Sequence, residues 1–450
     1  MSRVVVVGAG RSGLGVTEHL VKLGKNVTVT ESKPRLDEQV AVRLAELSVP
    51  SVCGSHPFSL LSECEELVIS PGISLTSPFV AEALRLGIPI VGELELAHRA
   101  LRGRGDESII LAVTGTNGKS TTTDLLAHLF RVANIPSVAC GNLGIPLITA
   151  MNCGVPRMRY ALECSSYQLE TVRAFHAEAA VILNLSPDHL SRHVTIENYR
   201  DIKMRIFQHQ SAEDLQLAPM CDSMLDGFFL GNGRNARFGW NCPDGFGAWC
   251  DGYGNLWLKN DDGAHLLIHR SQLIIPGDHN VENAIVAATL ANHGGAGLEE
   301  IREGLRTYAG LAHRIMLCGE RNSIKVYNDS KGTNVSATMM AIKSLPGPLV
   351  LILGGQDKGV GYQLLRQAVA GKLRSFVFLG EAIPQLERDL GDLPHRSVCC
   401  FDKAVDVAFE LAMEGDQILL SPACASFDQF RNFEERGEKF ETMVRDWVAR

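Results

Sequence analysis

The chain has 450 residues, of which 45% are hydrophobic and 21% are charged, and its formal net charge is −8. This composition is typical of a globular protein of roughly two to four domains. The acidic balance argues against general binding to nucleic acids or membrane surfaces, and no apolar run is long enough to predict a membrane span. The 12 cysteines lack the spacing of a zinc site, which favours reduced thiols in a cytoplasmic protein.

The first glycine-rich turn follows the apolar run at residues 4–7. Gly8, Gly10 and Gly13 have the Gly-x-Gly-x-x-Gly spacing, and the next predicted strand ends at the acidic Glu31. In a parallel sheet, such a turn holds a pyrophosphate against the N-terminus of the following helix. The spacing does not identify the rest of the ligand. A nicotinamide cofactor, another nucleotide diphosphate and a purely structural turn are all compatible with it.

The second glycine-rich turn is the strongest functional motif of the chain. A predicted strand at 111–114 leads into Gly-Thr-Asn-Gly-Lys-Ser-Thr at residues 115–121. Backbone N–H groups of such a turn bind phosphate oxygens, Lys119 adds a positive charge, and the Ser120 hydroxyl is a ligand for Mg²⁺. The general P-loop has a glycine where Val113 stands. The match is therefore incomplete, and the alternative is a glycine turn that begins an ordinary helix.

The order of predicted elements gives an α/β protein of three segments. Strands alternate with helices, which predicts mostly parallel sheets. Short glycine-punctuated pieces between residues 213 and 275 predict a small antiparallel sheet within the second segment. A stretch rich in arginine and glycine at 98–106 predicts a linker. We place the domains at residues 1–98, 99–309 and 310–450.

In the third segment, three predicted strands end in polar loops. These loops are residues 328–334, 354–359 and 421–426. Ligands of open α/β sheets bind beyond the carboxyl ends of the strands, so we expect the three loops to face one crevice.

Three residues of the second segment are candidate metal ligands. Glu163 and His189 each follow a predicted strand, which places them at the same edge as the P-loop. A lone histidine, however, is more often an ordinary hydrogen-bonded residue. Lys203 falls within the apolar stripe of a predicted helix at 196–208, where a lysine usually extends its amine to the surface. If the amine stays buried, desolvation keeps it neutral, and a neutral amine can react with CO₂ to give an anionic carbamate.

Several motifs together resemble the Mur ligase family, and the resemblance covers almost the whole chain. The motifs are residues 115–121, Glu-Cys-Ser-Ser-Tyr-Gln-Leu-Glu at 163–170, Asp188-His189, Tyr199-Arg200-x-x-Lys203, 328–334 and the run from Ser421 to Gly437. The last motif is the most specific and is most similar to the members that add D-glutamate. The resemblance implies a Rossmann-like N-terminal domain, a P-loop ATPase-like central domain with a small extra sheet, and a Rossmann-like C-terminal domain.

The activity implied by the resemblance is ATP-dependent amide ligation in peptidoglycan precursor synthesis. D-Glutamate would be added to UDP-N-acetylmuramoyl-L-alanine through an acyl phosphate. The implied cofactors are two Mg²⁺ ions and a CO₂-derived carbamate on Lys203. We expect a monomer whose partners are these small molecules, with neither nucleic acid nor membrane.

The resemblance also assigns site residues, position by position. The UDP-substrate would be bound by Gly8, Gly10, Arg11, Ser12, Gly13, Glu31, Ser32, Lys33, Ser70, Gly72 and Asn142. ATP would be bound by Gly115, Thr116, Asn117, Gly118, Lys119, Ser120, Thr121, Asn280, Asn283, Arg314, Asp329 and Lys331. D-Glutamate would be bound by Thr333, Lys358, Ser426 and Phe433. The catalytic residues would be Lys119, Glu163, His189 and Lys203, and the metal ligands Ser120, Glu163, His189 and Lys203.

Plainer roles stay open for some of these residues. Thr333 and Ser426 could cap the helices that follow them, and Lys358 could be an exposed loop lysine. Two positions also depart from the family pattern. Ser191 stands where aspartate is common, and Met316 stands where glutamate usually follows a His-Arg pair.

Three other functions are compatible with parts of the pattern. The first is a Mur-type ligase for a different amino acid. The second is a nicotinamide-dependent dehydrogenase with an attached ATPase domain, and the third is a non-enzymatic protein that binds a UDP-sugar. The Gly-Lys-Ser turn and the motif at 421–437 argue against the dehydrogenase. The set of Lys119, Ser120, Glu163 and Lys203 argues against the non-enzymatic protein.

Overall fold

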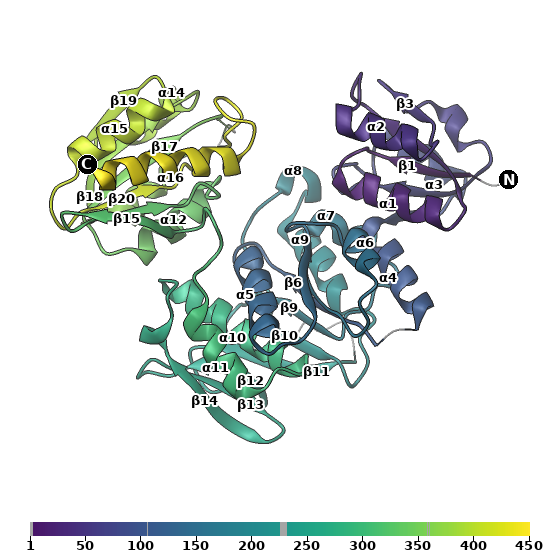
Figure 1. Cartoon of the computed structure of the whole chain (residues 1–450), viewed down its shortest axis with the longest axis horizontal. Coiled ribbons are helices and arrows are strands. Elements are labelled where there is room, and N and C mark those ends of the chain that lie inside the picture. The colour runs from purple at the N-terminus through teal and green to yellow at the C-terminus, as the bar shows by residue number, and fades with distance from the viewer. Residues whose placement is uncertain (1–2, 106, 226–231, 358, 360) are drawn as a thin grey trace. The chain divides into compact units, whose positions relative to one another are not determined.

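The computed structural model describes residues 3–105, 107–225, 232–357, 359 and 361–450. The chain divides into two compact units, Met1–Gln272 with Glu282–Thr307 and Leu273–Val281 with Tyr308–Arg450. The first unit holds a five-stranded and a nine-stranded sheet, and the second unit holds a six-stranded sheet (Figure 1). The α/β fold with mostly parallel sheets that the sequence predicts is therefore confirmed. None of the described helices is both long and apolar enough to cross a membrane.

The five-stranded sheet has the order β3-β2-β1-β4-β5, and all its strand pairs are parallel. Residues 4–7 of β1 are fully buried, as expected for an apolar strand covered on both faces. The strand order reverses between β1 and β4, which is where such sheets bind ligands, and the first glycine turn begins directly after β1. The elements are β1 (Arg3–Val7), α1 (Arg11–Lys22), β2 (Asn26–Glu31), α2 (Glu38–Glu46), β3 (Ser51–Cys53), η1 (Phe58–Leu61), β4 (Cys64–Ile69), α3 (Pro78–Arg85) and β5 (Ile90–Gly92).

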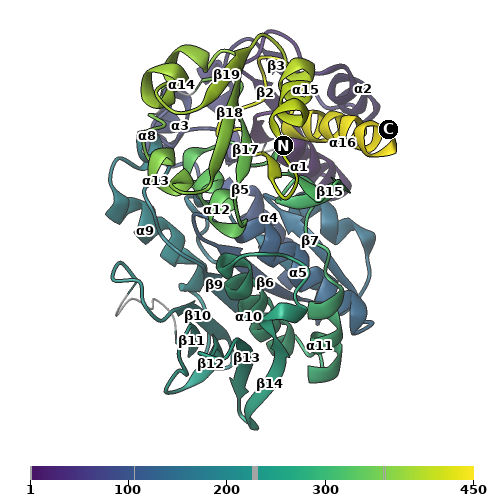
Figure 2. The same ribbon diagram turned by 90° about the vertical axis from the view of Figure 1, so that its left-hand side faces the viewer.

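The nine-stranded sheet has the order β14-β13-β12-β11-β10-β9-β6-β8-β7. Strands from β12 to β7 pair in parallel, and only β13 and β14 are antiparallel to their neighbours. The segment at 213–275 thus extends the central sheet instead of forming a sheet of its own, and Figure 2 shows its strands continuing the row from β6 and β9. The pairing of β10 with β9 joins distant residues, which local patterns do not reveal.

The elements of this part are α4 (Glu93–Arg104), β6 (Ile109–Thr114), α5 (Lys119–Val132), β7 (Ser137–Gly141), α6 (Leu147–Ala150), η2 (Met151–Cys153), β8 (Arg159–Glu163), α7 (Ser166–Leu169), β9 (Ala179–Ile182), α8 (Leu190–His193), α9 (Ile196–Met204), η3 (Arg205–Phe207), β10 (Leu215–Pro219), β11 (Arg234–Gly239), β12 (Phe246–Cys250), β13 (Asn255–Asn260), β14 (Gly263–His269), η4 (Arg270–Gln272), α10 (Asp278–His293) and α11 (Leu298–Thr307).

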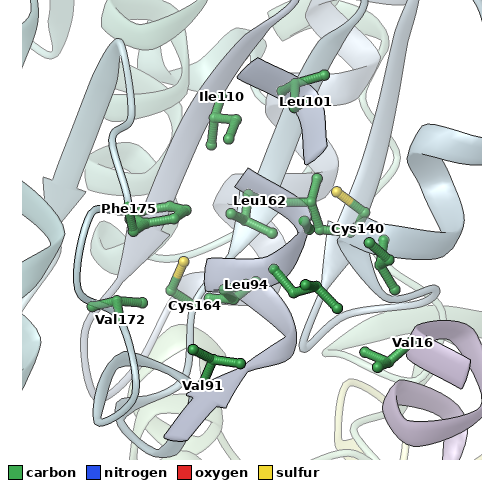
Figure 3. Close-up of a cluster of buried hydrophobic side chains, with 14 of the residues drawn as sticks. Val16, Val91, Leu94, Leu101, Ile110, Cys140, Leu162, Cys164, Val172 and Phe175 are labelled. Atoms are coloured by element: carbon green, nitrogen blue, oxygen red, sulfur yellow. The ribbon is translucent and has the colours of Figure 1, made fainter. Parts of the chain in front are cut away.

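Helix α4 joins the two sheets of the first unit through one hydrophobic core. Val16 of α1, Leu94 and Leu101 of α4 and Leu162 of β8 all belong to this core (Figure 3). The prediction of a linker at 98–106 is therefore wrong for residues 98–104, because these residues belong to α4, which is largely buried. The arginines and Gly103 that suggested a linker belong to this helix, and Gly105 is its C-cap.

Buried carboxylates of α4 hold this helix against the central sheet. Glu93 Oε1 accepts a hydrogen bond from the Ile148 N–H at 2.7 Å, at the beginning of α6. Glu95 Oε2 accepts from the backbone N–H groups of Arg173 and Ala174 at 2.8 and 3.0 Å. The N-terminal and central sheets are therefore linked by polar contacts as well as by the shared core.

The six-stranded sheet of the second unit has the order β15-β16-β20-β17-β18-β19. Only β15 is antiparallel to its neighbour. Strands β16, β20 and β17 lie side by side, so the three polar loops that follow them meet at one edge, as the sequence predicts. The elements are β15 (Met316–Arg321), β16 (Ile324–Asn328), α12 (Val335–Ser344), β17 (Leu349–Gly354), α13 (Leu365–Val369), β18 (Leu373–Leu379), α14 (Ile383–Leu390), β19 (His395–Val398), α15 (Phe401–Leu411), β20 (Gln417–Leu420) and α16 (Phe433–Ala449).

Candidate active site

The P-loop connects β6 to α5, and its two glycines have conformations that favour glycine. Gly115 has φ 143° and Gly118 has φ 85°. A Cβ atom at Gly118 would lie 2.5 Å from Oδ1 of Asn283, which accepts a hydrogen bond from the Thr122 hydroxyl at 3.1 Å. Both Asn283 and Thr122 are buried. The turn is therefore fixed by close packing against Asn283 of α10.

Lys119 folds over this turn. Its Nζ donates to the carbonyl oxygens of Gly115 at 2.9 Å and Thr116 at 2.7 Å. Ser120 is next to it in the first turn of α5 and is 8% exposed. A cation and a hydroxyl at a helix N-terminus are the groups that a magnesium nucleotide requires.

Lys203 is buried beside the P-loop and does not extend to the surface. Only 1% of the residue is exposed, and its Nζ donates to the Gly115 carbonyl at 2.8 Å and to Thr114 Oγ1 at 3.2 Å. Burial lowers the pKa of the Lys203 amine well below its usual value, and the nearby charge of Lys119 lowers it further. The carboxylates of Asp188 and Glu163 oppose this shift. The geometry therefore shows that the amine is buried, and the lowered pKa favours its neutral form.

Glu163, the last residue of β8, has one carboxylate oxygen in use and one without a partner. Its Oε1 accepts from Asn142 Nδ2 at 2.6 Å, which brings two predicted site residues together. Its Oε2 is buried and has no hydrogen-bond partner among the residues that the structure describes. A buried carboxylate oxygen without a partner next to a phosphate-binding turn fits a magnesium ligand.

His189 is placed differently from Glu163 and Lys203. It has φ 54° at the start of α8, and its Nδ1 lies 3.0 Å from the Tyr167 hydroxyl. Within the described part of the chain, no group of three or more His, Cys, Asp or Glu side chains is arranged to hold a metal ion. The structure therefore brings Glu163 and Lys203 to the P-loop but does not assemble the full predicted metal set.

The first glycine turn lines a cavity of about 380 Å³. A Cβ atom at Gly13 would overlap the carbonyl oxygen of Gly8, so the helix approaches the turn too closely for any other residue. The cavity contains most of the predicted UDP-substrate residues. Its lining is Gly8, Ala9, Gly10, Arg11, Ser12, Glu31, Lys33, Leu36, Asp37, Ser70, Pro71 and Ile73.

Two further observations concern this cavity. Glu31 uses both carboxylate oxygens, since Oε2 accepts from the Ala9 N–H at 2.9 Å and Oε1 from the Ser32 hydroxyl and the Lys33 N–H at 3.1 Å. Burial acts to raise the pKa of Glu31, but these hydrogen bonds outweigh it and lower the pKa below its usual value. A second cavity of about 100 Å³ is lined by Arg11 of α1 and Asn142 of the loop after β7, among others.

In the second unit, Asp329 belongs to the loop after β16 and contacts the loop after β20. It is 1% exposed, and its Oδ2 accepts from the Ser421 hydroxyl at 2.6 Å. Burial raises the pKa of Asp329 to about 6, although the nearby Arg314 acts in the opposite direction. The Nε of Arg314 is buried without a hydrogen-bond partner in the described chain.

Asn280 is another residue predicted to bind ATP, and its side chain donates to the Pro276 carbonyl at 2.7 Å.

The proposed helix caps at Thr333 and Ser426 are not present. Helix α12 is capped by Asn334, whose side chain accepts from the Ala337 N–H, and α16 is capped by Asn432. The capping alternative for Thr333 and Ser426 is therefore wrong. Lys358 lies outside the described residues, as does the side chain of Ser191.

Arg436 is a buried residue that sequence reasoning missed. It is 2% exposed, and its guanidinium donates to Ser330 Oγ and the carbonyls of Ser330, Cys424 and Ala425 at 2.9–3.4 Å. Burial lowers the pKa of Arg436 to about 10. This one side chain thus holds together α16 and two of the three loops. An arginine in the apolar face of a helix, one turn after the Asn432 cap, was the signal that could have found it.

Glu441 supplies a carboxylate near the His-Arg pair, where Met316 departs from the family pattern. Its Oε1 accepts from Asn328 Nδ2 at 2.8 Å and lies 3.1 Å from His313 Nδ1. Met316 itself begins β15. The carboxylate comes from α16, more than a hundred residues along the chain, so the sequence around Met316 gives no indication of it.

The fold and the site define a P-loop nucleotide-binding protein with a second, dinucleotide-type glycine turn. Residues 2–92 match the family model described as Mur ligase MurD-like, N-terminal domain, and residues 113–291 match the Mur ligase middle domain. The UDP-N-acetylmuramoylalanine–D-glutamate ligase of Caldanaerobacter subterraneus subsp. tengcongensis is 38% identical over 459 residues, covering 99% of this chain and 98% of the relative. The protein of the same name from Acidobacterium capsulatum is 36% identical, covering 98% of this chain and 96% of the relative.

Solved structures of other Mur ligases share the fold. The UDP-N-acetylmuramate–alanine ligase MurC of Thermotoga maritima aligns with a TM-score of 0.60 at 18% identity, covering 99% of both chains. MurF of Acinetobacter baumannii aligns with a TM-score of 0.61 at 16% identity, covering 94% of this chain and 91% of that one. The chain belongs to the Mur ligase family, within the group of UDP-N-acetylmuramoylalanine–D-glutamate ligases.

Proposed function

We propose that this protein is an ATP-dependent ligase that joins D-glutamate to UDP-N-acetylmuramoyl-L-alanine in peptidoglycan precursor synthesis. The full-length similarity to relatives with this name gives the substrate pair. The observation that carries the chemistry is the convergence of Lys119 and Lys203 on the Gly115 carbonyl. Beside them is the Glu163 oxygen that has no hydrogen-bond partner in the described part of the chain. This arrangement suits phosphoryl transfer from ATP to a carboxylate.

The reaction has two steps. The L-alanyl carboxylate attacks the γ-phosphorus of ATP, which releases ADP and forms an acyl phosphate. The amine of D-glutamate then attacks the acyl carbon, a tetrahedral intermediate forms, and phosphate leaves as the amide is completed and the amine loses a proton. Lys119 offsets the charge that builds up on the transferring oxygens. We assign residues 1–98 to the UDP-substrate, 99–309 to ATP and 310–450 to D-glutamate.

Magnesium binding is assigned to Ser120, Glu163, His189 and a carbamate of Lys203. When bound, Mg²⁺ withdraws negative charge from phosphate oxygens. The neutral Lys203 amine attacks the carbon of CO₂, forming an N–C bond and releasing a proton, and the product is a carboxylate-like anion. Burial of the amine and the depressed pKa support this assignment, since only a neutral amine is nucleophilic.

A phosphate-release assay tests the proposed function. With ATP, Mg²⁺ and UDP-N-acetylmuramoyl-L-alanine present, single amino acids are offered in turn. We expect D-glutamate to support turnover far better than L-glutamate, D-alanine or meso-diaminopimelate. Equal rates with a neutral amino acid would leave only the broader assignment, a Mur-type ligase of different specificity.

A further inference from the structure

Tyr362 is a fully buried tyrosine in the second unit, between β17 and α13, and none of the roles above uses it. Its exposed fraction is 0%, and its ring packs in the core beneath the sheet. Its hydroxyl lies 3.1 Å from Asp357 Oδ1 and 3.0 Å from Cys424 Sγ. Asp357 belongs to the loop after β17 and Cys424 to the loop after β20. One buried hydroxyl therefore connects two loops from neighbouring strands.

These two loops carry residues that we assign to D-glutamate. Asp357 Oδ1 also accepts from the Gly359 N–H at 3.1 Å, so this carboxylate oxygen accepts two hydrogen bonds within the described residues. Ser426 lies two residues beyond Cys424 and is 2% exposed. A backbone hydrogen bond from Gln356 to Ala425 at 2.9 Å pairs the same two loops.

The direction of the hydrogen bonds follows from the chemistry of the groups. Burial raises the pKa of the Tyr362 hydroxyl, and the contacts with Cys424 and Asp357 raise it further. The hydroxyl therefore stays protonated and donates a hydrogen bond to the Asp357 carboxylate. Its oxygen can accept a hydrogen bond from the Cys424 thiol. A hydrogen bond to a carboxylate is stronger than one between neutral groups. Because the ring is held by the core, little entropy is lost in forming it.

We propose that Tyr362 is a positioning residue for the amino-acid substrate: its hydroxyl joins Asp357 and Cys424 and so fixes the spacing between the two loops that bind D-glutamate. The proposal rests on the proposed function for the identity of the amino acid. The hydroxyl acts on substrate binding through the loops and takes no part in the chemical steps. Its loss should therefore change KM for the amino acid and leave kcat unchanged.

Tyr362→Phe tests the proposal, because it removes the hydroxyl and keeps the ring. We expect KM for D-glutamate to rise about 10- to 150-fold, the range for a lost hydrogen bond to a charged group, with kcat and the KM values for ATP and the UDP-substrate within about twofold of wild type. Tyr327→Phe is the matched control, the same change at a partly buried tyrosine of β16, and should change none of these values.

Two further measurements separate positioning from a general loss of structure. Asp357→Ala, at an exposed position, should raise the same KM, and the double variant with Tyr362→Phe should be little worse than either single one. Hydrogen exchange at residues 354–359 and 421–426 should be faster in Tyr362→Phe than in wild type. The exchange measurement needs no substrate, so it tests the link between the loops even if the wild-type protein turns over a different amino acid.

The outcomes are distinct. Wild-type protein that is inactive with D-glutamate but active with another amino acid would overturn the proposed function, and the KM for that amino acid would then test Tyr362. An unchanged KM with unchanged exchange in Tyr362→Phe would overturn the positioning role. A fall in kcat at constant KM would also overturn it, since the hydroxyl would then act on the chemical step.

Discussion

The side-chain nitrogens of Lys119 and Lys203 donate to the same carbonyl oxygen, that of Gly115, at 2.9 and 2.8 Å. Two ammonium groups so close together would repel each other, and Lys203 is also removed from water. Burial, and then the charge of Lys119, lower the pKa of Lys203 well below its usual value. The P-loop is thus flanked by two lysines with different chemistry, one suited to phosphate oxygens and the other to reaction as a free amine.

Lys203→Ala should lower kcat by at least about 100-fold, because it removes the proposed carbamate while the fold is kept. Lys203→Arg should not restore activity, since arginine stays charged and forms no carbamate. Acetate added to Lys203→Ala should restore part of the rate by supplying a carboxylate. The measurements are phosphate release and the thermal unfolding midpoint, with the exposed Lys22→Ala as control. Full activity of Lys203→Arg would rule out the carbamate.

Glu93 should make the stability of the protein depend on pH. Burial raises the pKa of Glu93 from 4.5 to about 7, although the N–H groups of Ile148 and Leu147 act against this shift. The folded state holds this proton more tightly than the unfolded chain. The contribution of Glu93 to stability is therefore greatest below pH 4.5 and is lost as pH rises through about 7.

Glu93→Gln keeps an oxygen for the Ile148 N–H but does not ionise. We expect this variant to be more stable than wild type by about 1–3 kcal/mol at pH 8, with the difference shrinking toward pH 4.5. Urea unfolding at pH 5 and pH 8 measures the effect. A difference that is the same at both pH values would show that Glu93 does not titrate in this range.

Gly13→Ala should abolish binding of the UDP-substrate. The added Cβ would overlap the Gly8 carbonyl oxygen and force the turn apart. Gly10→Ala is the comparison, since a Cβ atom there meets no protein atom within 4 Å. Gly10→Ala should unfold at the wild-type temperature, whereas Gly13→Ala should be less stable by about 1–3 kcal/mol. Calorimetric titration with UDP and thermal unfolding check both statements, and wild-type UDP affinity in Gly13→Ala would contradict them.

Arg436→Lys should destabilise the second unit although the substitution keeps the positive charge. Lysine has no planar fork and could reach at most part of the four oxygens that Arg436 contacts, so buried carbonyls of Ser330 and Cys424 would lose their donors. We expect a loss of about 2–4 kcal/mol in the free energy of unfolding. Arg445→Lys, on the exposed side of α16, should change it by less than about 0.5 kcal/mol.

The parts of the site that could be predicted from sequence are those in which neighbouring residues carry the information. The turns at Gly8 and Gly115 follow from glycine spacing and flanking apolar runs. The apolar stripe leaves a buried Lys203 open but favours an amine that extends to the surface. The Gly13 requirement is equally local, because the helix begins within the same few residues.

The remaining features depend on contacts between distant residues. Arg436 reaches the Cys424 carbonyl only after α16 packs on the last sheet, and Glu441 approaches His313 for the same reason. Helix α4 looked like a linker because its arginines suggested solvent, whereas Arg102 and Arg104 contact Glu178 and the Met151 carbonyl. No local pattern predicts which partner a long side chain will find.

The core shared through α4 has a consequence for how the chain can be divided. A fragment ending at residue 98 would cut α4 in its middle and expose Val91 and Leu94 to water. In the remaining chain, Phe175 and Leu162 would lose the apolar side chains that cover them. Neither piece would keep a closed interior, so the two sheets should melt together in a single cooperative transition. In gene fusions or swaps between related chains, the five-stranded and nine-stranded sheets should therefore be exchanged together.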